Sequence, residues 1–347
     1  MKTKQLLTLK NPPARRRSRR AVCKETFVTR YLQLLIMKNY KLSCILWTLV
    51  GLISCTGVNS QSNNSVSDSK VFRDYWYDGK AELTRYELEQ VRYGETHKGD
   101  AVLIFVTEDF WTDKQVKYEG GKRTDKVKPI LKLNFTRKFF TGIYPYSMMS
   151  SIFTPVDISQ PTYKVTSTSQ EWCGHTFSQL NYKSGKYRGQ LFSYFQEEGD
   201  EEFTLNKAML EDEIWTKIRL NPSSLPTGDI ELIPGNQFLR LRHRQFGIER
   251  ATASLENVSD VKLSTKQLKK YRVAYKDLKR VLEITFEDEF PYAIVAWEEQ
   301  MQSGFRNPKV LTTRAIRTHS INSAYWGQHN QVDAHLRREL GLEESNY

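Results

Sequence analysis

The sequence has no long hydrophobic run, and outside its first 54 residues it has almost no excess positive charge. The 347-residue chain carries a formal charge of +12. Residues 1–54 contribute twelve Lys or Arg and one acid, Glu25, which leaves 40 basic and 39 acidic side chains in the rest. A folded part without a positive excess lacks the electrostatic footprint of a nucleic-acid-binding domain. We therefore expect no nucleic-acid partner.

The sequence also lacks a glycine-rich phosphate loop after a strand, and its histidines have no metal-ligand spacing. A metal site needs three or four ligands, and no other histidine is spaced to join Cys173 and His175. We expect neither a metal nor a cofactor.

A short apolar stretch at residues 42–54, L-S-C-I-L-W-T-L-V-G-L-I-S, follows the basic start M-K-N-Y-K at Met37. About thirteen residues are too few to span a bilayer comfortably and fit the apolar region of a secretory signal. We expect residues 37–54 to be a signal peptide and residues 1–36 to be an unusual upstream extension or non-native. A weak membrane anchor or a plain cleaved signal is the alternative.

The end of that stretch, L-I-S-C at residues 52–55, resembles the lipobox of bacterial lipoproteins. The resemblance implies cleavage before Cys55, lipidation of Cys55 and a membrane partner. Residues 55–70 are rich in Ser and Asn and suit a flexible tether. Thr56 after the cysteine is compatible with sorting to the outer membrane, facing the periplasm. Because Cys23 and Cys44 precede the cleavage point, Cys173 would be the only free thiol.

Residues 71–347 are expected to form a mainly β domain. Period-two patterns bounded by turn residues favour an antiparallel curved sheet, as a sandwich or an open barrel. The expected strands cover residues 80–93, 101–107, 130–136, 163–169, 170–180, 188–195, 229–233, 238–244, 271–275, 281–286 and 292–297.

Two helices interrupt the strand pattern. Residues 205–220 place Leu210, Ile214 and Ile218 on one stripe, which predicts a mid-chain helix. Its acidic residues 211–213 lie opposite Lys217 and Arg219 and are expected to be solvated or bridged to the sheet, at i, i+4 spacing. A short C-terminal helix is expected at residues 331–340, with Gly341 at its end.

The run Q-E-W-C-G-H-T at residues 170–176 holds the main candidate for chemistry. In an extended strand, Cys173 and His175 share one face about 6.5 Å apart, with Glu171 beside them. A Cys–His pair can act as nucleophile and base, but such dyads usually come from separate segments. The alternative is a strand in which Cys173 is a small buried residue. A solitary thiol in an oxidising envelope favours that burial.

The aromatic residues Tyr144, Tyr146, Trp172 and Trp215 are candidates for an apolar ligand pocket, with packing as the alternative. Four runs carry a wider resemblance: Y-W-Y-D-G-K-A-E (75–82), G-I-Y-P-Y-S (142–147), Q-E-W-C-G-H (170–175) and E-D-E-I-W-T-K-I-R-L-N-P (211–222). They resemble uncharacterised cell-envelope lipoproteins often labelled septum formation inhibitor Maf. The resemblance implies an envelope lipoprotein and supplies no mechanism. Maf pyrophosphatases carry an S-x-R-R motif after their first strand. This sequence has no such motif in that position, so pyrophosphatase activity is not expected.

Two functions follow from these features. The first is a non-catalytic, lipid-anchored cell-envelope protein that binds an apolar ligand or an envelope partner. The second is an envelope hydrolase or thiol enzyme that uses Cys173 and His175, with Glu171 nearby.

Replacing Cys55→Ala removes the expected lipidation site. We expect the variant to move from the membrane pellet to the soluble fraction after cell breakage and a salt wash, because a protein without its acyl chains has no stable hold on the bilayer. Immunoblots of the two fractions measure the shift. A Cys55→Ala protein that stays in the pellet after a salt wash would contradict the lipoprotein prediction.

Overall fold

The computed structural model describes residues 69–304 and 306–342. The predicted upstream extension, the signal peptide, Cys55 and nearly all of the tether lie outside these residues. The described chain begins at Ser69, whose hydroxyl accepts a hydrogen bond from Phe72 N at 3.1 Å and so caps helix α1 (Lys70–Trp76). Lys70, the last residue of the predicted tether, thus already belongs to a helix.

The strands fall into two series separated by a mixed segment. The first series is β1 (Ala81–Arg92), β2 (Glu95–Trp111), β3 (Val116–Lys117), β4 (Val127–Thr141), β5 (Tyr144–Pro155), β6 (Lys164–Glu171), β7 (Gly174–Lys183), β8 (Lys186–Ser193) and β9 (Glu201–Asn206). The mixed segment is β10 (Met209–Leu210), η2 (Glu211–Glu213), α2 (Ile214–Leu220), η3 (Pro222–Ser224), β11 (Gly228–Ile233) and α3 (Asn236–Arg242). The second series is β12 (Glu249–Val258), β13 (Leu268–Tyr275), β14 (Arg280–Glu287), β15 (Ile294–Ser303) and β16 (Lys309–Ser323), followed by η4 (Tyr325–Gly327), η5 (Gln331–Ala334) and α4 (His335–Glu339).

These strands form one 16-stranded sheet within the described residues. Its order is β10-β11-β12-β13-β14-β15-β16-β1-β2-β4-β5-β6-β7-β8-β9, with β3 beside β2, and only the β10–β11 pair is parallel. Antiparallel pairing of β1 with β16 joins the two series. The register shifts at Arg85/Tyr86 in β1 and at Thr285/Phe286 in β14, and such bulges bend a sheet. The sheet is curved and open, because β9 and β10 at its two ends do not pair.

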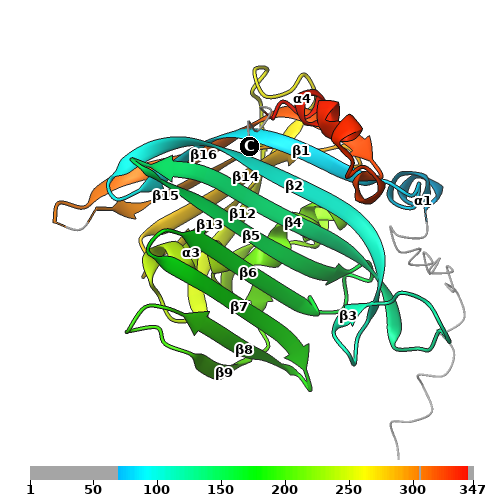
Figure 1. Cartoon of the computed structure of the whole chain (residues 1–347), viewed down its shortest axis with the longest axis horizontal. Coiled ribbons are helices and arrows are strands. Elements are labelled where there is room, and N and C mark those ends of the chain that lie inside the picture. Colours follow the sequence, from blue (N-terminus) through cyan, green and yellow to red (C-terminus); the bar gives the residue numbers. More distant parts are fainter. Residues whose placement is uncertain (1–68, 305, 343–347) are drawn as a thin grey trace, which may run out of the picture. The chain divides into compact units, whose positions relative to one another are not determined.

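The curved sheet folds around the mixed segment. Figure 1 shows β4 to β9 in front of β12 to β14, with α3 behind the front strands. Trp215 of α2 packs its ring against Phe135 of β4 at 5.0 Å and against Trp297 of β15 at 5.3 Å, and all three are buried. Residues from both strand series therefore share one core with α2.

Buried ion pairs hold the mixed segment inside the sheet. Arg280 of β14 donates to Glu211 of η2 from both terminal nitrogens, one of them at 2.7 Å, and to Glu299 of β15 from Nε at 2.6 Å. Glu299 also lies 3.7 Å from Arg137 of β4. Burial alone would raise the pKa of Glu299, but the Arg280 and Arg137 guanidinium groups hold it below its usual range. The network thus joins β4, β14 and β15 through charges that offset one another.

The start of α3 is fixed to the same network. Gly235 precedes α3, and a Cβ built there would lie 2.5 Å from Glu211 Oε1, so only glycine fits this close approach. The carboxylate of Asp212 accepts hydrogen bonds from Asn236 N at 3.1 Å and Asn236 Nδ2 at 2.5 Å. Ser178 of β7 donates to Asn236 Oδ1 at 2.8 Å. Helix α3 is therefore tied both to η2 and to the front strands.

The predicted mainly β, antiparallel curved architecture is confirmed. The mid-chain helix exists and buries Leu210, Ile214 and Ile218, but the α-helix covers only 214–220 because residues 205–206 end β9 and 209–210 form β10. The C-terminal helix is also present, and Gly341 follows it with φ +70°.

Three expectations about this region are wrong in part or whole. Residues 238–244 were expected as a strand but lie mostly in α3, which is buried on nearly every side and so shows no polar stripe. The acidic residues 211–213 are buried, not solvated. The alternative is confirmed, because Glu211 bridges to Arg280 of the sheet and Glu213 pairs with Lys217 one turn later at 2.9 Å. Residues 170–180 are two strands, β6 and β7, joined by a turn.

Replacing Arg280→Ala leaves Glu211 and Glu299 buried without their main cation. We expect the free energy of unfolding to fall by about 3–5 kcal/mol, because breaking a buried pair leaves the partner charge buried and unpaired. Arg272→Ala is the matched control on β13, since Arg272 is more exposed and pairs with Glu283; it should cost less than about 1 kcal/mol. Urea denaturation measures the free energy of unfolding of both variants. Equal losses of stability would contradict the prediction that the buried network stabilises the fold more than an exposed ion pair does.

Candidate functional site

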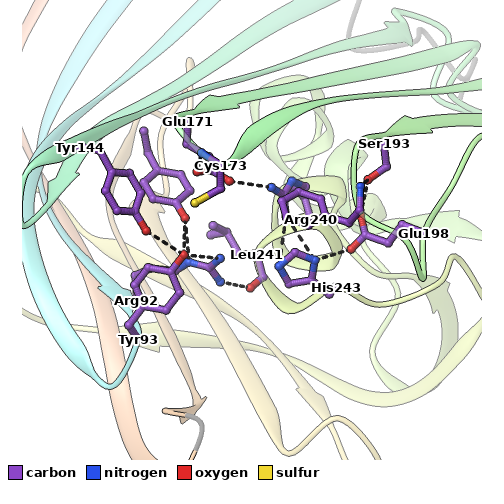
Figure 2. A network of polar contacts seen from close by, with 12 residues as sticks. Arg92, Tyr93, Tyr144, Glu171, Cys173, Ser193, Glu198, Arg240, Leu241 and His243 are labelled. Carbon is purple, nitrogen blue, oxygen red and sulfur yellow. Dashed lines mark hydrogen bonds and ion pairs between the residues drawn. The ribbon is translucent and has the colours of Figure 1, made fainter.

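One end of the sheet gathers several turns around the end of α3. In an antiparallel sheet with short turns, every second connection falls at the same end. The β1–β2, β4–β5 and β6–β7 turns and the β8–β9 loop therefore meet there. We call this end the α3 rim and define it by Arg92, Tyr93, Tyr144, Tyr146, Glu171, Trp172, Cys173, Glu198, Arg240 and His243; Figure 2 shows most of these side chains pointing toward one another.

Arg92 organises the tyrosines of the α3 rim. Its Nε donates to Tyr146 Oη at 3.3 Å and its Nη2 donates to Tyr93 Oη at 3.2 Å, while Nη1 donates to the carbonyl of Leu241. The three tyrosine hydroxyls are linked, because Tyr93 Oη lies 2.8 Å from Tyr146 Oη and 3.1 Å from Tyr144 Oη. Burial raises the pKa of Tyr146 far above its usual value, so its hydroxyl stays protonated.

A second cluster surrounds Glu171 at the end of β6. The Glu171 carboxylate accepts the Cys173 backbone N–H at 2.7 Å and Arg240 Nη2 at 3.2 Å. Arg240 stacks over the Phe195 ring at 4.5 Å. His243 Nδ1 lies 2.5 Å from Glu198 Oε1, and Ser193 donates to the other oxygen of Glu198 at 2.8 Å. The contacts of Glu171 with Arg240 and of Glu198 with His243 join β6, the β8–β9 loop and α3.

The end of α3 explains why Arg92 sits where it does. The helix terminates with His243 in the left-handed region at φ +49°, and Arg244 N donates back to Leu239 O at 3.0 Å. The carbonyl of Leu241 has no further helical N–H to accept, so Arg92 supplies one.

The structure does not assemble the expected Cys–His dyad. Trp172 and Cys173 form the two-residue turn between β6 and β7, so Cys173 and His175 are not on one face of one strand. His175 pairs with Gln170, and both are exposed, whereas Glu171 is buried on the opposite face. Cys173 is exposed, contrary to the expected burial, because it lies at the tip of this turn.

The thiol of Cys173 is not activated. The Glu171 carboxylate, through its hydrogen bond and its negative charge, and partial burial together raise the thiol pKa above its ordinary value. Because the thiolate is the reactive form, a raised pKa lowers nucleophilicity at neutral pH. Glu171 instead serves as the carboxylate partner of Arg240.

Three of the four aromatic pocket candidates meet at the α3 rim. Tyr146 is buried and stacks on Phe139 at 4.7 Å, and Tyr144 lies 6.3 Å from the Trp172 ring in a stacked arrangement. Trp215 belongs to the core with Phe135 and Trp297 and so lines no pocket there. Sequence reasoning missed Arg92, Arg240 and His243. The alternating basic run at 240–244 was the available signal, and it was assigned to a strand.

Apolar side chains protrude from successive turns of the α3 rim. Ile143 in the β4–β5 turn is 80% exposed, Trp172 in the β6–β7 turn 67% and Tyr194 in the β8–β9 loop 78%. The Tyr194 ring packs over Gly174, where a Cβ would lie 3.0 Å from it. Large apolar groups at neighbouring tips, beside several arginines, are typical of a binding surface.

Two hollows flank His243. The larger, about 510 Å³, is lined by Phe195, Glu197, Glu198, Glu201 and Arg244, among others. The smaller, about 120 Å³, lies between the β1–β2 turn, the end of α3 and the end of β15. Among the described residues, no three His, Cys, Asp or Glu side chains gather as metal ligands.

In the part of the chain that the structure describes, every helix is too short or too polar to cross a bilayer.

Comparisons with known proteins add one structural likeness. No protein-family model matches the chain, and no curated protein matches it. Among solved structures, the chain is similar to a β-barrel-like protein of the domain of unknown function DUF1849 from Brucella abortus, with 10% identity, a TM-score of 0.40, and coverage of 70% of this chain and 98% of that chain. The lipoprotein resemblance stays a prediction.

Replacing Glu171→Gln removes the charge that raises the Cys173 pKa. We expect wild-type Cys173 to react with iodoacetamide at pH 7.5 more slowly than free cysteine, whose pKa is about 8.5. The variant should react faster than the wild type, because its thiol ionises at lower pH. Mass spectrometry of the Cys173 peptide measures the rates. A wild-type rate above that of free cysteine would indicate an activated thiol and restore the enzyme hypothesis.

Proposed function

We propose that this protein is a non-catalytic binding protein of the cell envelope, held to the membrane through Cys55, and that it binds an envelope partner or ligand through the α3 rim. The observation that carries the proposal is the row of protruding side chains, Ile143, Trp172 and Tyr194, beside a cluster of arginines. Exposed aromatic residues next to arginine are the types that contribute most to binding energy at interfaces.

The packed interior favours a surface site over an enclosed apolar one. The core around α2 holds the large aromatic side chains of both strand series, including Tyr86, Phe135, Trp215 and Trp297. A ligand enclosed between the two strand series would have to displace these aromatic rings. The expected apolar contacts are better supplied by the protruding side chains of the α3 rim.

Helix α1 and the α3 rim lie at opposite ends of β1. Helix α1 precedes the start of β1, whereas the α3 rim lies where β1 ends at Arg92, so the two occupy opposite ends of a 12-residue strand. Figure 1 shows α1 and α3 at opposite ends of the strands.

The alternative, an envelope hydrolase or thiol enzyme, has less support. Its nucleophile Cys173 has a raised thiol pKa, and its base His175 lies on the far face of the sheet from Glu171. Glu171 and His243 of the α3 rim are engaged in ion pairs with Arg240 and Glu198.

Replacing Trp172→Ala in a Cys55→Ala background tests the proposal. The unlipidated protein, released from membranes by a salt wash and then added back at low salt, sediments with envelope fragments only if its folded part binds them. We expect the unaltered background protein to bind saturably and Trp172→Ala to weaken binding about tenfold, the loss typical of an aromatic anchor. Quantitative blots of pellet and supernatant measure the affinity.

Trp326→Ala is the matched control, since Trp326 is another exposed tryptophan, in η4 near the C-terminus. It should bind like the background protein. Equal affinities for the Trp172 and Trp326 variants would reject the α3 rim as the binding surface.

A further inference from the structure

The smaller hollow of the α3 rim has the chemistry of an anion site. Its lining includes Arg92, Tyr93, Leu241, Arg242 and Ser303. Its volume of about 120 Å³ is large enough for a tetrahedral oxyanion. No carboxylate side chain belongs to its described lining.

Arg92 brings an uncompensated charge to this hollow. The residue is only 7% exposed, and within residues 69–304 and 306–342 no carboxylate lies within ion-pair distance of it. Its three hydrogen bonds go to a carbonyl and two phenol hydroxyls, so two of its five N–H groups remain to be used. A buried guanidinium without a counter-ion is costly, and a bound anion would offset that cost.

Neighbouring arginines add to the positive potential. Arg242, exposed at the end of α3, forms the opposite side of the hollow. Burial and the charges of Arg244 and Arg92 lower the pKa of Arg242, which shows that like charges crowd this end of the helix. Three acids of this region are engaged in other ion pairs: Glu171 with Arg240, Glu198 with His243, and Glu299 with Arg280.

Hydroxyl and backbone groups complete the lining. Ser303 Oγ accepts a hydrogen bond from Gly94 N at 3.0 Å, which leaves its proton to donate. Gly94 and Gly304 face each other with φ +84° and +107°, and a Cβ on Gly94 would lie 3.4 Å from the Gly304 Cα. The close approach of these two turns places Ser303 beside Arg92 and Arg242 in one pocket.

We propose that this pocket binds a phosphate group. Two arginines and a serine line this one hollow and can supply N–H and O–H donors, and no carboxylate belongs to its described lining. Planar guanidinium forks suit the several acceptor oxygens of a phosphate. The inference rests on the proposed function and names the class of its ligand: free phosphate, or the phosphomonoester of an envelope headgroup, seated on Arg92 and Arg242 while the protruding aromatic residues contact the remainder.

Calorimetric titration of the full-length protein in detergent tests the site with three probes at constant ionic strength: inorganic phosphate, glycerol 3-phosphate and glycerol. We expect saturable binding of a phosphate probe with a Kd below about 1 mM and no binding of glycerol. Binding of glycerol 3-phosphate assigns the site to a phosphomonoester. Binding of inorganic phosphate alone assigns it to the free ion.

Arg242→Gln is the test variant, because an exposed side chain can be changed without disturbing the fold, and Arg250→Gln is the matched control, at an exposed position of β12. We expect Arg242→Gln to weaken phosphate binding at least tenfold and Arg250→Gln to leave it unchanged. Absence of saturable binding by the wild type, or equal affinities in the two variants, would overturn the phosphate site. If Trp172-dependent envelope binding then persists, the proposed function stands without it.

Discussion

The ion pairs of Arg280 with Glu211 and Glu299 are the interaction on which the arrangement of this protein depends. A sheet this wide, open at β9 and β10, has a concave face that must be covered by something. The mixed segment from β10 to α3 covers it, and Glu211 at the start of that segment is held by Arg280 of β14. Because Glu299 shares the same arginine and lies near Arg137, the segment is bound to both strand series together. The desolvation of these groups is offset only when all of them are present.

The position of α3 follows from this network and determines the candidate site. Gly235 lets the chain pass close to Glu211, and Asn236 bonds to Asp212, so the helix starts at a fixed point inside the sheet. Seven residues later it ends among the turns, where the carbonyl of Leu241 meets Arg92. The arginines at 240, 242 and 244 are thereby brought to the turns that carry Ile143, Trp172 and Tyr194. The α3 rim is thus a consequence of how the interior is filled.

Much of the fold could be read from the sequence, because strands with one buried face show it by alternation. The expected strands at 271–275 and 281–286 are the paired β13 and β14, and the expected 80–93 is β1. The sequence pattern failed where burial was complete: α3 is enclosed and reads as an alternating basic strand, and Glu211 looks like a solvated residue until Arg280 is seen beside it. The turn at Trp172 and Cys173 contains no Asn, Asp or Pro, so the boundary between the two expected strands, 163–169 and 170–180, was placed ahead of the real turn.

The candidate site was predicted only in part, for a related reason. Tyr144, Tyr146 and Trp172 were identified as aromatic residues suited to a ligand, and all three lie at the α3 rim. Arg92 could not be found from the sequence, since its neighbours Tyr146 and Leu241 are 54 and 149 residues away. The placement of Cys173 depended on a turn that no local signal marked, and its raised thiol pKa depended on that turn facing Glu171.

Hydrogen exchange of the full-length protein in its native membranes, compared with the purified protein in detergent, tests the central claim that the α3 rim is the binding surface. The account predicts slower exchange in native membranes at the β4–β5 and β6–β7 turns and at residues 240–244, with little change on the outer face of β7 to β9. Slower exchange confined to that outer face, with the α3 rim unchanged, would contradict it.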